Sequence, residues 1–360
     1  MKIRNKSLRE VKNNVKYFAC AFYLDKDIKH KISNSFFDNC SFRSRFKLGY
    51  IENCTFQNCT FPNGLEFSWN HRSKIPEEVW HLYSLTHLDL EYEPEYTNQS
   101  SYELGPFYTA NREELPKEIE QLSNLTHLAI RQNGLIKISK EIGQLSNLRF
   151  LDLTHNKIKE LPKEIGQLSN LTHLSLSNNE LEKLPEEIGQ LSNLEFLDLS
   201  RNRLEKLPKE IGQLSNLTYL SLYSNKLEKL PEEIGQLSNL TTLDMIRNKL
   251  VELPKKIGQL SNLNRLCLSS NRLKKLPKQI GQLSNLNRLF LSYNEFKKLP
   301  KEIGQLSNLT HLSLRYNEFK KLPKEIEKFP KLANLDLRKN YIQKRPTKIH
   351  RGIKWLPQRI

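Results

Sequence analysis

The sequence has no hydrophobic run long enough to cross a lipid bilayer. A membrane-spanning helix needs roughly 20 mostly apolar residues, whereas the apolar stretch nearest the start, residues 17–24, ends at Asp25. We therefore expect no transmembrane helix. The same stretch follows a basic segment but is too short for a convincing secretory signal. We expect a protein that is cytoplasmic or exported by an unconventional route.

Cysteines are few, and the common catalytic motifs are missing. Five cysteines in 360 residues are an odd number at low density, which argues against the disulfide framework of a small secreted domain and favours reduced thiols. The chain has no glycine-rich phosphate loop and no nucleophile elbow, and its histidines are scattered. We therefore predict no catalytic residue, no cofactor and no enzymatic activity.

Positive charge is not gathered in one place, although the formal net charge is +17. Residues 1–74 hold 14 basic and 6 acidic side chains, whereas residues 75–124 hold 2 basic and 11 acidic ones. Residues 337–360 have eight Lys or Arg and no acid. We therefore expect no continuous basic stripe for nucleic acid, and a solvated basic tail explains the C-terminal charge.

What the sequence has in abundance is one repeated phrase. Residues 161–183 read LPKEIGQLSNLTHLSLSNNELEK, and similar phrases recur at a strict spacing of 23 residues. An asparagine marks each repeat: Asn133, Asn156, Asn179, Asn202, Asn225, Asn248, Asn271, Asn294, Asn317 and Asn340. Two earlier segments, residues 65–70 and 85–90, keep the strand part of the pattern. We predict a solenoid of about 12 coils that begins near residue 62.

Each phrase has the physical features of one coil. Leucines alternate with polar or variable residues in residues 171–176, which is typical of a short strand with one buried face. Pro162 suits the first position of a short helical or 3₁₀ turn, on which Ile165 and Leu168 lie three residues apart. One coil alone cannot bury enough apolar surface to offset its ordering entropy. Stacked coils can, and their strands form a parallel sheet that needs a cap at each end.

The constant residues of the phrase are predicted to be structural. A buried asparagine in a tight turn can hydrogen-bond backbone groups that the turn leaves unpaired. The ten asparagines are therefore expected to form a structural ladder and not a column of ligands. The Gly-Gln-Leu-Ser-Asn-Leu segment is interpreted in the same way, because a surface that recognises a partner would differ from coil to coil.

The phrase LPxEIGxLxNLxxLxLxxNxL resembles the 23-residue leucine-rich repeats of bacterial, plant and animal intracellular families. It is most similar to leptospiral leucine-rich repeat proteins, and the resemblance covers most of the chain. It implies an α/β solenoid of horseshoe shape, with a parallel β-sheet on the concave face and short helical or 3₁₀ turns on the convex side. It also implies protein binding, but no common partner, because members bind unrelated partners through different concave residues.

The N-terminal region has a shorter rhythm of its own. Four cysteines are each followed two residues later by phenylalanine: Cys20, Cys40, Cys54 and Cys59. The pattern resembles the small and large inward residues of pentapeptide repeats, so we predict a small β-rich cap at residues 1–61 with buried thiols. The alternative is a zinc site formed by the last three of these cysteines with His30. Cys-x4-Cys without a second close pair is a weak zinc signature, and we predict no metal site.

Two further segments depart from the repeat. Residues 91–110 form an acidic, tyrosine-rich insertion. A solvent-exposed loop without a binding role and a loop that contacts a partner are equal alternatives for it. Residues 345–360 leave the pattern and predict a basic C-terminal cap. The predicted organisation is a cap at 1–61, a solenoid at 62–344 that carries the insertion, and a second cap at 345–360.

Residues that alternate with the strand leucines must point outward onto the concave face, and they vary between coils. Aromatic and arginine side chains are typical anchors of interfaces. We predict a partner-binding surface made of two strips. The apolar strip comprises Phe150, Phe196, Tyr219 and Tyr223, and the cationic-aromatic strip comprises Arg265, Arg288, Phe290, Tyr293, Arg315 and Tyr316. The alternative is that these rings only pack as ladders between strands, which stabilises a sheet without any partner.

These features favour a non-catalytic scaffold for protein–protein interaction, for example a bacterial effector or host-interaction protein. The sequence identifies neither the partner nor the oligomeric state. Two alternatives stay open. Arginine and tyrosine on the later coils could hold phosphates and stack bases, although nucleic acid or another polyanion is the less favoured partner. A metal-binding or adhesive surface protein would require export.

Overall fold

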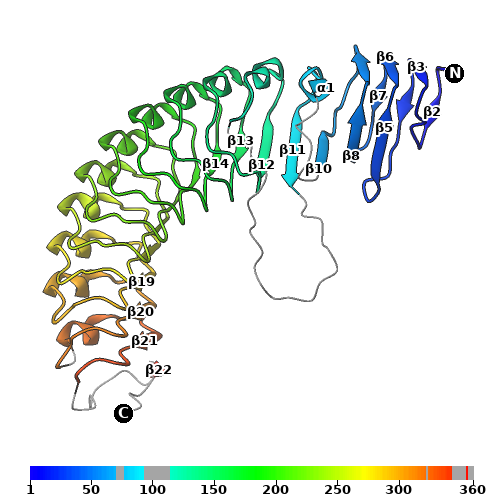
Figure 1. Ribbon diagram of the computed structural model, residues 1–360. Helices are drawn as coiled ribbons and strands as arrows, with labels where there is room; N and C mark the ends of the chain where they lie inside the picture. Colours follow the sequence, from blue (N-terminus) through cyan, green and yellow to red (C-terminus); the bar gives the residue numbers. More distant parts are fainter. Residues whose placement is uncertain (70–76, 93–113, 322, 343–353, 356–360) are drawn as a thin grey trace, which may run out of the picture. The chain divides into compact units, whose positions relative to one another are not determined.

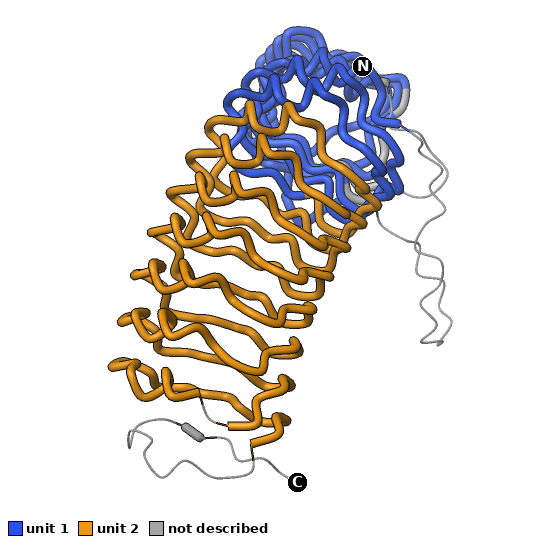
Figure 2. The backbone as a smooth tube through the Cα atoms, turned by 90° about the vertical axis from the view of Figure 1, so that its left-hand side faces the viewer, with its two compact units in different colours: residues 1–175 blue, residues 176–360 orange. Residues whose placement is uncertain are grey.

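The computed structural model describes residues 1–69, 77–92, 114–321, 323–342 and 354–355. They belong to two compact units, Met1–Ser175 and Leu176–Ile360 (Figure 2), and each unit is described by itself. Most of the predicted insertion at 91–110 and of the predicted cap at 345–360 lies outside the described residues. Within the described part of the chain, no helix is long and apolar enough to cross a membrane.

Unit 1 begins with coils of short parallel strands (Figure 1). One sheet contains β1 (Lys2–Arg4), β3 (Lys16–Phe18), β6 (Phe36–Asp38) and β9 (Thr55–Gln57), and a second contains β2 (Ser7–Leu8), β4 (Ala21–Phe22) and β7 (Ser41–Phe42). A third contains β5 (Lys29–Ser33), β8 (Phe46–Glu52) and β10 (Leu65–Trp69). Strands before and after residue 61 therefore pair in one sheet, and the three-part division of the chain stays a prediction.

Columns of aromatic rings fill these first coils. Tyr17, Phe37 and Phe56 stack with centroids 5.0 and 4.7 Å apart. Phe22, Phe42 and Phe61 form a second column, with spacings of 4.7 and 4.8 Å. Each stacked pair contributes about 0.5–1.5 kcal/mol beyond the apolar area that it buries. Aromatic stacking thus takes the place that leucine packing has in the later coils.

The four cysteines of this region are free, and each exposes at most 8% of its surface. The thiols of Cys20 and Cys59 each lie 3.3 Å from a backbone carbonyl oxygen two residues earlier, that of Phe18 and Gln57 respectively. Local bonds of this kind suit small buried side chains. The described residues contain no group of three or more His, Cys, Asp or Glu side chains that could hold a metal ion.

From β10 to β21 each coil has a strand on one side and a short helix on the other. Unit 1 contains β11 (His87–Tyr92), β12 (His127–Arg131), β13 (Phe150–Asp152) and β14 (His173–Ser175), with α1 (Glu77–Trp80) and the 3₁₀ helices η1 (Lys117–Gln121), η2 (Lys140–Gln144) and η3 (Lys163–Gln167). The strands of unit 2 are β15 (Phe196–Asp198), β16 (Tyr219–Ser221), β17 (Thr242–Asp244), β18 (Arg265–Cys267), β19 (Arg288–Phe290), β20 (His311–Ser313), β21 (Asn334–Asp336) and β22 (Lys354–Trp355). Its 3₁₀ helices are η4 (Glu186–Gln190), η5 (Lys209–Gln213), η6 (Glu232–Gln236), η7 (Lys255–Gln259), η8 (Lys278–Gln282), η9 (Lys301–Gln305) and η10 (Lys324–Lys328).

Within unit 2 the strands line the inner side of the curve and the 3₁₀ helices lie on its outer side (Figure 1). The strands are parallel and in register, so that Leu220 pairs with Leu243 and Leu243 with Leu266. These three leucines are completely buried. Corresponding leucines of successive coils therefore pack on one another, which is what the 23-residue period requires.

The position predicted for the proline is wrong by one residue. Pro162 is the N-cap of η3 and not its first residue, with an extended backbone of φ −66° and ψ 148°. Its carbonyl oxygen accepts a hydrogen bond from the Ile165 amide at 3.1 Å. Proline suits this position because its ring sets φ in advance and because no N–H is needed there.

The asparagine of each repeat is buried, and from Asn202 to Asn340 each one bonds to the backbone of its own coil and of the preceding coil. In unit 2, Nδ2 of Asn202 donates to the carbonyl oxygens of Leu176 and Leu199 at 2.9 and 3.0 Å, and its Oδ1 accepts from the amide of Leu181 at 3.0 Å. The amide side chain thereby pairs three backbone groups that the turn leaves without backbone partners.

The residue before each of these asparagines has a left-handed backbone. Its φ lies between 53° and 58° in every coil from Gln132 to Lys339. An L-residue in this backbone region costs roughly 1–2 kcal/mol, and asparagine costs least after glycine. Of the residues at this position, Asn178 is therefore the best suited. The conformation directs the amide toward the next coil, as when Ser270 N donates to Ser292 O at 2.8 Å.

A substitution at Ser270 tests this geometry. Ser270→Asn is expected to raise the free energy of unfolding by about 0.5–1 kcal/mol, because asparagine tolerates the left-handed region. Ser270→Val is expected to lower it by about 1–2 kcal/mol, because a β-branched side chain clashes there. Thermal and urea unfolding of both variants measure the effect, and equal stability of the two would show that this residue is not left-handed.

Candidate partner-binding face

The candidate face consists of the strand side chains that alternate with the buried leucines. At one register position these side chains are His87, His127, Phe150 and His173 in unit 1, and Phe196, Tyr219, Thr242, Arg265, Arg288, His311 and Asn334 in unit 2. Neighbouring strands lie about 4.8 Å apart, so adjacent side chains cover one another. Most are half-buried, whereas Arg288 is exposed.

In unit 1, Phe150 lies among histidines. Its ring centroid is 5.8 Å from that of His127 and 6.1 Å from that of His173. His87 stacks on His127 at 4.1 Å with an interplanar angle of 11°. Burial lowers the pKa of both His87 and His127, so the stacked pair is uncharged at neutral pH. Phe150 is therefore the one residue of the predicted apolar strip that lies in unit 1, where it belongs to a row of histidine and phenylalanine rings.

The threonine before each histidine determines which ring nitrogen carries the proton. The Thr126 hydroxyl donates to the Thr86 carbonyl at 3.0 Å and lies 2.9 Å from Nδ1 of His127. A hydroxyl has one proton to donate, so Nδ1 of His127 donates to the threonine oxygen. Thr172 and His173 have the same arrangement. In His127, whose pKa burial lowers, Nε2 is then the acceptor atom.

An ion-pair cluster lies beside this aromatic row. Arg131 is 2.6 Å from a carboxylate oxygen of Asp152 and 3.2 Å from one of Asp89, and Arg45 is 3.4 Å from Asp89. Burial raises the pKa of Asp89, and the Coulombic effect of Arg131 opposes that rise. Because each carboxylate already has a cation, this part of the face offers little free charge to a partner.

In unit 2, two sets of aromatic contacts lie in the region of the predicted apolar strip. Phe196 and Tyr219 stack at 4.6 Å with an interplanar angle of 5°. Tyr223 lies between two guanidinium groups, those of Arg201 at 5.9 Å and Arg247 at 5.7 Å from its ring centroid. Both distances are within the range of cation–π attraction.

The later coils of unit 2 carry the arginines of the predicted cationic-aromatic strip. Arg265 lies over the Phe290 ring at 4.9 Å, and its Nε donates to Sγ of Cys267 at 3.2 Å. Cys267 is completely buried, and burial raises its pKa to about 11. Arg315 lies over the Tyr316 ring at 4.8 Å. Tyr316 also stacks on Tyr293 at 4.3 Å, so these contacts join five of the six predicted residues, and Arg288 is not among them.

The aspartates of this face have a local structural role. Oδ1 of Asp198 accepts from the amide of Ser200 at 2.8 Å, and Oδ1 of Asp244 accepts from the amide of Ile246 at 3.0 Å. Such an Asx turn ends the strand. Burial raises the pKa of Asp244. The recurrence of aspartate along the strands is therefore explained by the backbone and needs no partner.

Comparison with known proteins identifies the repeat. A family model described as a leucine-rich repeat region matches residues 109–180, 163–226 and 208–292, and a second model, leucine rich repeat, matches residues 284–342. A solved leucine-rich repeat protein of Leptospira interrogans is 40% identical with a TM-score of 0.73, covering 84% of this chain and 72% of that one. The chain belongs to the leucine-rich repeat family. No curated protein matches it.

Two other solved structures are more distant relatives. A TDR receptor is 28% identical with a TM-score of 0.63, over 77% of this chain and 47% of that one. The functional domain of InlJ from Listeria monocytogenes, whose structure includes a cysteine ladder, is 28% identical with a TM-score of 0.54, over 64% of this chain and 47% of that one. The predicted leucine-rich repeat solenoid and its likeness to leptospiral proteins are confirmed. This fold commonly serves as a scaffold for protein–protein interaction and is typically non-catalytic.

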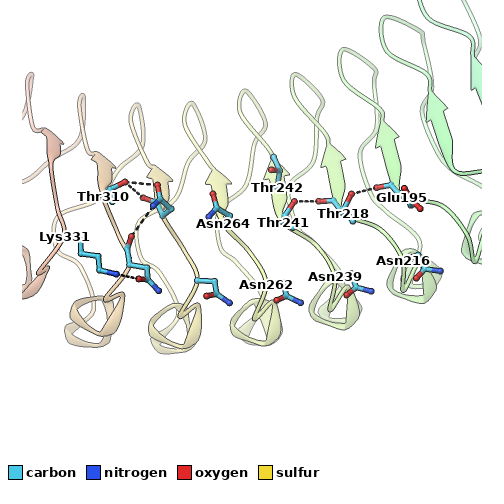
Figure 3. Close-up of a pocket in the computed structure, with 13 residues that line it drawn as sticks. Glu195, Asn216, Thr218, Asn239, Thr241, Thr242, Asn262, Asn264, Thr310 and Lys331 are labelled. Atoms are coloured by element: carbon cyan, nitrogen blue, oxygen red, sulfur yellow. Dashed lines mark hydrogen bonds between the residues drawn. The ribbon is translucent and has the colours of Figure 1, made fainter.

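A polar groove runs along unit 2 of this leucine-rich repeat protein, where the chain enters each strand (Figure 3). Its volume is about 1000 Å³, and Glu195 and Lys331 lie at its two ends. Five of its thirteen lining residues are the second asparagine of a repeat: Asn216, Asn239, Asn262, Asn285 and Asn308. Each such amide donates to a serine carbonyl of the preceding coil, for example Asn216 to Ser192 at 2.8 Å and Asn262 to Ser238 at 2.9 Å. The groove is therefore a by-product of scaffold hydrogen bonds.

Sequence reasoning missed several charged residues that lie beside the strand side chains of the two units. Arg131 and Arg45 were not singled out, because their contacts with Asp89 join residues 42 and 44 positions apart. Arg201 and Arg247 were also missed, although they immediately precede a repeat asparagine, the same position as the selected Tyr293 and Tyr316. Their recurrence one coil before and one coil after Tyr223 is the signal that could have found them.

Proposed function

We propose that this leucine-rich repeat protein is a non-catalytic module that binds a protein partner, chiefly through the strand face of unit 2. The proposed contact residues are Phe196, Tyr219, Tyr223, Arg265, Arg288, Phe290, Tyr293, Arg315 and Tyr316, together with Phe150 in unit 1. The observation that carries the proposal is the density of half-buried aromatic rings and guanidinium groups on one face. Rings held in place by stacking lose little entropy on binding, which is typical of interface anchors.

Ladder packing alone explains part of the stacking but not the arginines. A stacked pair such as Phe196 and Tyr219 stabilises adjacent strands without a partner. Arg265 and Arg288, however, are direct neighbours in the sheet register, and like charges in that arrangement destabilise a sheet. A feature that costs stability is better explained by binding.

A role as an effector or host-interaction protein stays a prediction. It is supported only by similarity to proteins of Leptospira interrogans and Listeria monocytogenes. The alternative of a metal-binding or adhesive surface protein has no observation in its favour among the described residues, and binding of nucleic acid is treated below as an outcome of the test.

Affinity capture with matched variants tests the proposed function. The double variant Phe196→Ala with Tyr219→Ala is expected to lose the captured partner, with binding at least about tenfold weaker, because both rings of one stack are removed. The control is Tyr23→Ala with Tyr83→Ala, which removes two rings that are each 51% exposed outside this face. Binding is measured with the purified partner, and thermal unfolding checks that both variants fold. Equal binding by the two double variants would contradict a role for this face.

A further inference from the structure

Three arginines on β18, β19 and the turn after β20 lack a direct ion-pair partner within the described part of the chain. Arg265 and Arg288 occupy paired positions on the neighbouring parallel strands β18 and β19. Among the described residues, neither they nor Arg315 form an ion pair. Two carboxylates of this face lie nearby. Arg338 holds Asp336 with hydrogen bonds of 2.7 and 2.9 Å, and Asp244, on the strand next to Arg265, interacts with that arginine electrostatically but forms no ion pair with it. The face therefore has guanidinium groups that no carboxylate of the described residues pairs directly.

Two of these arginines are held in position by other contacts. Arg265 is supported by the Phe290 ring and by Sγ of Cys267, and Arg315 by the Tyr316 ring. Nε of Arg315 is buried and has no hydrogen-bond acceptor. An unpaired buried donor is costly, so this guanidinium would gain a hydrogen bond by turning toward an incoming acceptor. Arg288 is exposed on the same face.

We propose that this cluster, Arg265, Arg288 and Arg315 with the rings of Phe290, Tyr293 and Tyr316, binds an acidic segment of the protein partner in extended conformation. The inference rests on the proposed function and specifies the chemistry of the partner. A planar guanidinium pairs with a carboxylate through two parallel hydrogen bonds. Adjacent strands are about 4.8 Å apart, and side chains on one edge of an extended peptide repeat about every 7 Å. Long arginine side chains can span that difference.

Nucleic acid fits this cluster less well. Binding of single strands depends on bases that stack on open aromatic faces. Here one face of Phe290 is covered by Arg265, and one face each of Tyr293 and Tyr316 is used in their mutual stack. Tyr316 also has the guanidinium of Arg315 over its ring. The rings thus position the arginines and one another, and carboxylates gain more from the cluster than bases do.

The test uses the full chain and a short fluorescent peptide of alternating glutamate and tyrosine at physiological ionic strength. Wild type is expected to bind it, and Arg288→Gln with Arg315→Gln to bind it at least about tenfold more weakly. The matched control is Arg203→Gln with Arg272→Gln, which removes the same charge at two exposed positions outside the cluster and should bind like wild type. Circular dichroism and thermal unfolding confirm that all variants fold.

Two comparison ligands decide between acidic peptide and other partners. A peptide in which glutamine replaces glutamate should not bind, and equal binding would overturn the inference. A short thymidine strand that binds more tightly than the acidic peptide, with the same dependence on Arg288 and Arg315, would identify a nucleic-acid surface instead. If wild type does not bind the acidic peptide while capture of the partner still depends on Phe196 and Tyr219, this inference fails and the proposed function stands.

Discussion

Replacing Asn225 with alanine is expected to lower the free energy of unfolding by about 3–5 kcal/mol, since each buried backbone group left unpaired costs about 1–3 kcal/mol. Nδ2 of Asn225 donates to the carbonyl oxygens of Leu199 and Leu222 at 3.0 and 3.1 Å, and its Oδ1 accepts from the Leu204 amide at 3.0 Å. Alanine leaves all three without this partner. Water cannot easily reach them, because Asn225 is 8% exposed.

The control for this prediction is the other asparagine of the repeat. Asn216 is exposed and makes one described side-chain bond, to the Ser192 carbonyl at 2.8 Å. Asn216→Ala should cost less than about 1 kcal/mol, because water can replace an exposed bond. Urea unfolding followed by circular dichroism measures both variants. Equal losses would show that the buried asparagine has no special role in holding the coils.

Replacing Gly212 with alanine is expected to destabilise the protein by about 1–3 kcal/mol through overpacking. A Cβ at Gly212 would lie only 2.4 Å from the carbonyl oxygen of Glu233 and 2.8 Å from Cβ of Glu233 and Oε1 of Gln236. These atoms belong to η6 of the next coil. The backbone oxygen cannot move without separating the two coils, so the gain in helix propensity from alanine is outweighed.

A second glycine in the same position of the repeat serves as the matched control. The three atoms nearest a Cβ at Gly304 would all belong to the side chain of Lys328, with Cδ at 2.8 Å and Cβ at 3.2 Å. A flexible lysine can move aside, so Gly304→Ala should change stability by less than about 1 kcal/mol. The chain itself has a larger residue, Glu327, at the position that corresponds to Gly304 in the next repeat. Differential scanning calorimetry of the two variants decides the matter, and a Gly212→Ala variant as stable as Gly304→Ala would show that the coils have room to spare.

The sequence predicted the leucine-rich coils well because their information is local. Alternating leucines, a proline and an asparagine recur within one 23-residue phrase, and each has a physical role that neighbours in sequence reveal. The exact place of Pro162 was missed by one residue, since whether a proline lies just inside or just outside a helix depends on ψ, which the sequence does not reveal.

The predicted site residues illustrate where sequence reasoning ends. It selected Phe196 and Tyr219 as neighbours because the period places them at one register position, and they do stack. It could not tell that Arg265 would lie over Phe290 or that Arg315 would keep a buried Nε without an acceptor, because side-chain rotamers are chosen by packing between coils. Whether a partner uses these residues is what the two binding experiments measure.

The sequence by itself determined the family, the repeat length, the alternation of buried leucine with outward residues and the position of the asparagine in each coil. Periodicity is sufficient for these features because every coil satisfies the same local constraints. Only the tertiary structure decided that Arg131 joins Asp89 and Asp152, that β5 and β8 pair in the same sheet as β10, and which rings cover which guanidinium groups. Except for the contact of Arg315 with the adjacent Tyr316, those features depend on contacts between residues about 20 or more positions apart, whose geometry exists only once the coils have stacked.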